Sequence, residues 1–176
     1  MKHITTPLTK EKLKDLVAGE QISISGTMYT ARDAAHKRLI EMIKKGETLP
    51  FDVNQQIIYY VGPTPAKAHK VIGSAGPTTA LRMDAYAGVL YDMGLAMSIG
   101  KGYRTQAIVD NIQKNGACYG VAIGGLGALL SQCIKKSEVI AFADLKSEAI
   151  RKLEVENFPL TIAIDGNGNN VYKEML

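Results

Sequence analysis

Short apolar runs and helix-like segments alternate through the middle of this 176-residue chain, and this alternation restricts its fold more than any other feature. The apolar runs lie at 56–61, 95–99, 118–123 and 139–143. Such alternation is typical of parallel strands joined by helices, whereas the two ends of the chain have antiparallel patterns. We therefore expect an α/β domain with a mixed central sheet.

Caps, periodicity and turn residues predict where the elements begin and end. Thr9 is a suitable N-cap, and Gly46, Gly94 and Gly116 stand where helices would end. We expect helices at 10–17, 31–45, 83–93 and 103–115, a strand at 21–27, and a hairpin that joins 160–164 to 169–172. No linker, repeat or low-complexity segment divides the chain, so residues 1–176 are expected to form a single domain.

The composition argues against several classes of function. Hydrophobic residues make up 46% of the chain and charged residues 22%, as in ordinary soluble domains. The net charge of +4 comes from scattered lysines and arginines, not from a dense basic face with interleaved aromatics. We therefore expect no nucleic-acid binding, and the mild positive balance suits a small anionic substrate.

The cysteine pattern argues against a metal centre held by this chain. Cys118 and Cys133 are the only two cysteines, they form no CxxC motif, and only three histidines accompany them. This set is too small for a structural zinc site or a self-contained iron–sulfur cluster. We expect two reduced, buried thiols in a cytoplasmic protein that binds no metal or cofactor by itself.

The uncharged stretch 117–134 raises the question of a membrane span. It contains four glycines, so we interpret it as a buried strand, a glycine turn and a short packed helix. The first residues also lack the apolar core of a signal peptide. We expect no membrane association.

The stretch from Gly73 to Asp84 has the composition of a binding loop. Two glycines and Pro77 are followed by the hydroxyls of Thr78 and Thr79 where a helix would begin. Helix N-termini attract anions, and Thr78 and Arg82 are four residues apart, which places them on one helical face. The alternative is an N-capped helix after a Gly-Pro turn, with Arg82 merely solvated.

Nucleotide and hydrolase motifs are incomplete in this chain. The glycine loop lacks the lysine of a P-loop, and Gly125-Leu126-Gly127 lacks the third glycine of a dinucleotide fingerprint. No GxSxG elbow is present either. Phosphate and acyl-transfer chemistry therefore have little support.

Cations recur at the strand-to-helix turns. Arg32 follows one strand, Arg82 opens the helix after the glycine loop, and Lys101 lies in a Gly-Lys-Gly turn. Turns after parallel strands meet at one edge of a sheet, where two arginines could hold two carboxylates and Lys101 could add a charge. Each residue alone could equally be a solvated surface cation.

Other polar residues have structural interpretations. We expect His36 to pack on its helix or to pair with Asp33 or a neighbour, and His69 to be exposed. Asp84 is expected either to pair with Arg82 or Lys101 or to be a first-turn helix charge.

The order of these motifs resembles that of a known family. Over nearly its whole length, the chain is similar to the beta subunit, or C-terminal domain, of class I (iron–sulfur) fumarate hydratases and tartrate dehydratases. The resemblance rests on Gly26-Thr27-Met28-Tyr29-Thr30-Ala31-Arg32-Asp33-Ala34-Ala35-His36, Tyr60-Val61-Gly62-Pro63-Thr64-Pro65, Gly73-Ser74-Ala75-Gly76-Pro77-Thr78-Thr79, Arg82-Met83-Asp84, Ile99-Gly100-Lys101-Gly102, Gly124-Gly125, Leu153-Glu154-Val155-Glu156, Phe158-Pro159 and Ala163-Ile164-Asp165.

The resemblance implies a swivelling β/β/α domain that completes an active site built mainly on a partner. That alpha subunit would hold a 4Fe-4S cluster through three cysteines, in a heterotetramer or higher heteromer. Arg32, Arg82 and Lys101 would bind the dicarboxylate substrate, and Thr78 would be the base at the C3 proton. A threonine hydroxyl needs activation to act as a base, so donation to a substrate carboxylate is an alternative role for Thr78.

The implied function is that of a hydro-lyase beta subunit which, with its alpha subunit, hydrates fumarate reversibly to (S)-malate in the tricarboxylic acid cycle. L(+)-tartrate dehydratase, which forms oxaloacetate, is the alternative because the same carboxylate-binding residues would serve it. A non-catalytic anion-binding module is the alternative from a different class.

Overall fold

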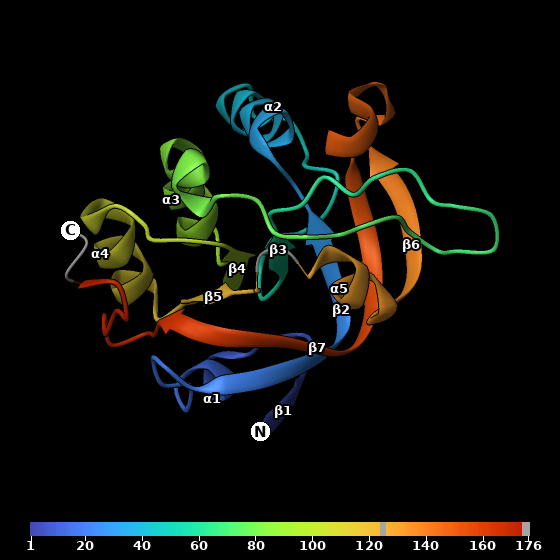
Figure 1. The fold of residues 1–176 in the computed structure, drawn as a ribbon. Helices are drawn as coiled ribbons and strands as arrows, with labels where there is room; N and C mark the ends of the chain where they lie inside the picture. Colours follow the sequence, from blue (N-terminus) through green and yellow to red (C-terminus); the bar gives the residue numbers. More distant parts are fainter. Residues whose placement is uncertain (124–125, 174–176) are drawn as a thin grey trace.

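The computed structural model describes residues 1–123 and 126–173, and its seven strands form one mixed sheet with helices packed beside it (Figure 1). The strands are β1 (Lys2–Thr5), β2 (Gln21–Thr30), β3 (Ile57–Tyr59), β4 (Met97–Gly100), β5 (Cys118–Val121), β6 (Ile134–Ala141) and β7 (Ile150–Ile164). The α-helices are α1 (Lys10–Leu13), α2 (Asp33–Lys44), α3 (Asp84–Asp92), α4 (Gln106–Asn115) and α5 (Gly127–Gln132), and two 3₁₀ segments are η1 (Ala80–Met83) and η2 (Ala143–Glu148).

Five of the strands pair in a closed ring. The sheet order is β1-β2-β3-β4-β5-β7-β6, and β2 also pairs with β7, so β2, β3, β4, β5 and β7 form a closed, barrel-like core. β2 to β5 run parallel to one another, whereas the fifteen-residue β7 is antiparallel to β2, β5 and β6. The mixed α/β sheet expected from the sequence is confirmed.

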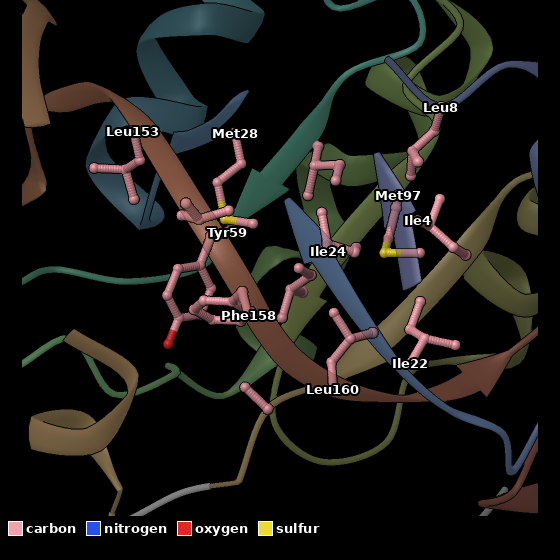
Figure 2. Close-up of a cluster of buried hydrophobic side chains, with 14 of the residues drawn as sticks. Ile4, Leu8, Ile22, Ile24, Met28, Tyr59, Met97, Leu153, Phe158 and Leu160 are labelled. Carbon is pink, nitrogen blue, oxygen red and sulfur yellow. The ribbon is translucent and has the colours of Figure 1, made fainter. Parts of the chain in front are cut away.

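Two apolar layers hold this architecture together. One fills the interior of the closed core, where Met28, Tyr59 and Phe158 are fully buried (Figure 2). The other lies between the sheet and the neighbouring helices α2, α3 and α4, and includes Leu39, Leu90 and Ile112. Strand residues therefore face apolar surroundings on both sides, which explains why the middle strands have continuous apolar sequences.

The parallel strands place their carboxyl ends at one edge of the sheet. Thr30 pairs with Tyr59, Tyr59 with Ile99 and Gly100 with Val121, so these strands end level with one another. The segments that follow them therefore meet at the same edge, as the sequence predicted.

Several predicted elements have different bounds in the structure. The helix expected at 10–17 stops at Leu13, although Thr9 does cap it by accepting from the Lys12 amide at 3.4 Å. The strand expected at 139–143 extends from Ile134 to Ala141, because it pairs with β7 along that length. A strand, a turn and the short helix α5 do occupy 117–134, while Gly124-Gly125 lies outside the described residues.

The expectation of antiparallel pairing at the two ends of the chain holds for β2 and β7, which pair with each other antiparallel. β1, a strand that the sequence did not predict, pairs with β2 in parallel. The hairpin expected at 160–172 is reduced to a turn and one bridge, between Ile164 and Asn170. The reason is that β7 already has β2 and β5 as long-range partners, whereas Asp165 folds the following turn back on itself by accepting from the amides of Asn167 and Asn169.

Within residues 1–123 and 126–173, none of the helices combines the length and the apolar character that crossing a bilayer requires.

Two glycines in neighbouring helices provide a matched test of backbone strain. Gly116 ends α4 with φ +60°, whereas Gly88 lies inside α3, where an added Cβ would be 3.8 Å or more from its nearest neighbours. We expect Gly116→Ala to lower the free energy of unfolding by about 1 kcal/mol. Gly88→Ala should raise it by about 0.5–1 kcal/mol because alanine favours helix. Urea unfolding of both variants checks this, and a shift of the same sign in both would contradict it.

Candidate active site

The four candidate residues occupy segments that leave the carboxyl edge of the parallel strands. Arg32 lies two residues after β2, and Lys101 directly follows β4. Thr78 and Arg82 belong to the segment between β3 and α3. The fold therefore gathers at one edge residues that are as far apart in the sequence as Arg32 and Lys101.

Thr78 is held by backbone pairing with the neighbouring segments. Its N–H donates to the Tyr60 carbonyl at 2.7 Å, and its carbonyl accepts from the Lys101 N–H at 3.1 Å. Thr79 forms a parallel bridge with Lys101. Thr78 and Lys101 thus lie next to each other, and Thr78 is half-buried.

The predicted helical face shared by Thr78 and Arg82 is wrong. The helical segment begins at Ala80 as the 3₁₀ turn η1, and Thr79, which precedes it, makes no side-chain cap. Pairing of residues 78–80 with Lys101 keeps Thr78 extended, so it stands outside the helix. A long-range backbone contact has overridden the local capping pattern.

A carboxylate lies between the two arginines. Arg82 Nε donates to Asp33 Oδ2 at 3.1 Å, and Arg32 Nη2 lies 3.7 Å from Asp33 Oδ1. The buried Arg32 Nε has no hydrogen-bond partner among the described residues. Two guanidiniums that meet on one carboxylate can also bind a carboxylate from outside the chain.

Glycines bring the backbone of this edge close together. A Cβ on Gly100 would lie 3.0 Å from Ala80 Cβ and 3.1 Å from the Thr78 carbonyl oxygen. A Cβ on Gly62 would lie 3.0 Å from Arg32 Cδ. Larger residues at these positions would push Thr78, Lys101 and Arg32 apart.

The candidate site is an open edge. The Arg82 side chain is 55% exposed, Lys101 is exposed, and the Lys101 ammonium has no ion-pair partner in the part of the chain described here. Two grooves of ≈ 770 and ≈ 640 Å³ lie elsewhere, and none of the four candidate residues lines them. Water has free access to the cations unless another surface covers them.

His36 lies beneath Arg32 and is fully buried, as a packed helix residue. Its Nδ1 is 2.9 Å from the Arg32 carbonyl, and a carbonyl only accepts, so Nδ1 carries the hydrogen. Nε2 is buried without a partner among the described residues. Burial lowers the pKa of His36 to about 4, because protonation would place a charge in these surroundings.

This buried imidazole predicts a pH dependence of stability. The unfolded chain takes up a proton on His36 near pH 6.5, whereas the folded chain does so only near pH 4. Stability is therefore fully present above pH 6.5 and falls towards pH 4, by up to about 1.4 kcal/mol per pH unit from this group. Urea unfolding from pH 7.5 to 4.5 checks this. His36→Asn, which keeps a donor near Nδ1, should have a shallower slope, and an unchanged slope would exclude His36.

Asp84 does not pair with Arg82 or Lys101, contrary to one of the two expectations. Its Oδ1 accepts from Arg104 Nε at 2.6 Å, and its Oδ2 accepts from the Thr105 N–H at 2.7 Å. Arg104 is completely buried. The sequence had no signal for it, because arginines are rarely fully buried and Arg104 was expected in the first turn of a surface helix at 103–115.

The cysteines and His69 lie in structural surroundings. His69 is exposed, as expected. Burial raises the pKa of Cys118 to about 12, so its thiol is neutral, while Cys133 is only partly buried, contrary to expectation. No group of three or more histidine, cysteine, aspartate or glutamate side chains that could hold a metal occurs within the described ranges. Two separated thiols do not fit an iron–sulfur cluster.

Comparison with known proteins gives a consistent result. The family profile described as Fumarase C-terminus matches residues 2–175. The putative L(+)-tartrate dehydratase subunit beta of Methanocaldococcus jannaschii is 38% identical over 181 residues, which cover 99% of this chain and 93% of that protein. The anaerobic class I fumarate hydratase of Escherichia coli is 40% identical over 167 residues, and fumarate hydratase 2 of Leishmania major is 37% identical over 169 residues. These cover 94% and 95% of this chain but 30% of either hydratase.

Proposed function

This chain belongs to the fumarase C-terminal family, and from that membership we propose that it is the beta subunit of a class I fumarate hydratase. With an alpha subunit it would add water reversibly across the double bond of fumarate to give (S)-malate. The observation that carries the proposal is the meeting of Arg32 and Arg82 on one carboxylate, beside Thr78 and Lys101. Four groups at that edge could hold a dicarboxylate and move a proton.

The binding role falls to the cations. Arg32 and Arg82 would exchange Asp33 for a substrate carboxylate, which they can bind through paired N–H groups. Lys101 would neutralise the charge on the second carboxylate. Both ends of a four-carbon diacid would thereby be fixed relative to Thr78.

The proton-transfer role falls to Thr78. In the dehydration direction its oxygen would accept the C3 proton, and in hydration the same hydroxyl would return it. A free hydroxyl is a weak base, so the neighbouring charges of Lys101 and Arg82 would have to favour its ionised form. Donation from Thr78 to a substrate carboxylate is the alternative role.

The cofactor would belong to the alpha subunit. The described residues of this chain do not fit an iron–sulfur cluster, because Cys118 and Cys133 form no ligand set with other side chains. We propose that the partner holds a 4Fe-4S cluster, which supplies Lewis-acid chemistry, and that the complex is a cytoplasmic heterotetramer or higher heteromer. The closed core with helices beside it supports the proposed swivelling β/β/α class.

An exposed apolar surface next to the candidate site supports a partner. Ile123 is 68% exposed and Leu129 is 56% exposed. The Ala75 N–H donates to the Gly127 carbonyl at 3.1 Å, which places this region against the loop that leads to Thr78. Because the chain spans only 30% of the two hydratases compared above, the remaining part of such a protein is available to cover this surface.

Charge placed on this surface should prevent assembly. We expect Leu129→Lys to weaken co-purification with the alpha subunit by about tenfold or more, because a lysine there would lose its hydration in the interface. Val89→Lys is the matched control, since Val89 is 40% exposed on α3, which packs against α4. Equal retention of the partner by both variants would place the interface elsewhere.

L(+)-tartrate dehydratase is the second candidate, favoured by the coverage of 93% of a relative with that printed name. The test is to reconstitute the complex with its alpha subunit and to measure kcat/KM for malate, fumarate and tartrate. Turnover of tartrate without malate would replace the first assignment by the second. If the chain were a non-catalytic anion-binding module, the isolated chain would bind dicarboxylates and would have no stable alpha partner. It would turn over none of malate, fumarate and tartrate.

A further inference from the structure

We propose that Arg104 is a positioning residue that fixes Lys101 and Thr78 relative to Arg82. The inference rests on the proposed function, because it assigns a role within that site. Arg104 makes no direct contact with the candidate proton-transfer group or with the candidate carboxylate-binding groups. It would act through the backbone segments that carry them.

Arg104 is bonded on several sides in the interior. Its Nε donates to Asp84 Oδ1 at 2.6 Å, Nη1 to Ser98 Oγ at 3.0 Å and Nη2 to the Tyr60 hydroxyl at 3.2 Å. Its guanidinium carbon lies 4.7 Å from the centre of the Tyr119 ring. These contacts come from β4, β5, the start of α3 and the residue after β3.

A requirement for stability alone does not explain this arrangement. Burial of a charged pair costs desolvation free energy, and well-packed apolar side chains of similar volume often give equal stability. Arg104 instead fixes the relative positions of the four elements that it contacts, because its planar guanidinium holds its hydrogen-bond partners in one geometry. Three of these elements, β3, β4 and α3, flank the segments that carry Thr78, Lys101 and Arg82.

The turn that holds Lys101 is fixed from two sides. On one side Asp84 bonds Arg104 and the Thr105 amide, which ties residues 104–105 to the start of α3. On the other side the Tyr119 hydroxyl donates to the Gly102 carbonyl at 2.8 Å. Lys101 therefore has a defined position although its side chain is exposed.

The same network reaches Thr78 and the arginines. Tyr60 meets Arg104 with its hydroxyl, and its carbonyl accepts from the Thr78 amide. Asp84 directly follows η1, which contains Arg82. His36 packs edge-on against the Tyr60 ring at 5.3 Å and bonds the Arg32 carbonyl. Displacement of Arg104 would consequently move several site segments together.

The test uses the reconstituted alpha–beta complex carrying Arg104→Lys or Tyr119→Phe. Tyr119→Phe removes one hydroxyl from the network and retains the ring, so it should fold. We expect kcat to fall about 10- to 100-fold for Arg104→Lys and about 5-fold for Tyr119→Phe, because small misplacement of reacting groups is costly. KM should change less than about twofold. Arg151→Lys, whose arginine bonds Ser137 between β6 and β7, is the matched control and should keep wild-type kinetics.

A second measurement distinguishes a positioning role of Arg104 from a purely structural role. It does so independently of the proposed function. In NMR spectra of the variants, the Lys101 and Thr78 amide signals should shift, while signals from β6 should not. Unshifted signals together with wild-type kcat, or lower thermal stability with unchanged kcat, would overturn the role of Arg104. Wild-type complex that turns over none of malate, fumarate and tartrate would instead refute the proposed function, and the amide shifts would still decide on the positioning role.

Discussion

Thr78→Val is expected to lower kcat of the assembled complex by about a hundredfold to ten-thousandfold. Valine has nearly the same shape as threonine but cannot accept or return the C3 proton, and loss of a positioned acid–base group costs that much. The backbone bonds of residue 78 to Tyr60 and Lys101 do not involve the side chain, so the variant should fold and assemble. Steady-state kinetics on malate and fumarate measure the effect.

Thr78→Ser is the matched control because it keeps the hydroxyl. It should retain a substantial part of the activity, with a loss of about tenfold at most. A Thr78→Val complex with higher KM and nearly normal kcat would assign Thr78 to carboxylate binding, because only ground-state binding would then have been lost. Exchange of the C3 hydrogen of malate with deuterated water gives an independent reading of proton transfer.

Arg82→Ala is expected to lower kcat/KM by about a hundredfold or more while assembly is unaffected. Hydrogen bonds to a charged group are worth roughly 1.5–3 kcal/mol each, and this substitution removes a paired set from the substrate carboxylate. The side chain is 55% exposed and contacts Asp33 by its Nε, so its removal leaves no buried cavity. Kinetics and co-purification of the complex measure the two parts of this prediction.

Two variants make the Arg82 result specific. Arg82→Lys keeps the charge but not the paired donors, so it should recover only part of the activity. Arg38→Ala removes a half-exposed arginine that pairs with Asp144, and it should leave the kinetics unchanged. Near-normal turnover by Arg82→Ala would exclude Arg82 from substrate binding.

The order of strands and helices in the middle of the chain could be predicted because buried positions give a periodic hydrophobic pattern in the sequence. Apolar runs such as 95–99 and amphipathic segments such as 103–115 correspond to β4 and α4, with small errors at their ends. This hydrophobic pattern does not predict β1, where only Ile4 is buried and nothing in the four residues indicates a parallel partner. It also fails for the hairpin expected after β7, because β7 pairs with β2 and β5, which are distant in the sequence.

Predictions for the site divide in the same way. Arg32 and Lys101 lie at the expected sheet edge, because strand order and glycine turns follow from local sequence. The shared face of Thr78 and Arg82 was wrong, since pairing with Lys101 keeps Thr78 extended. The roles of these residues, and of the partner, stay predictions.

By itself the sequence determined the class of fold, the edge at which cations gather and the residue types available there. Only the tertiary structure decided which charges meet: Asp33 lies between the two arginines, and Asp84 pairs with the buried Arg104. The physical reason is that burial and periodicity are local properties of a segment, whereas an ion pair depends on the distance between atoms of different segments. Those distances exist only once the closed sheet has brought its strand ends together.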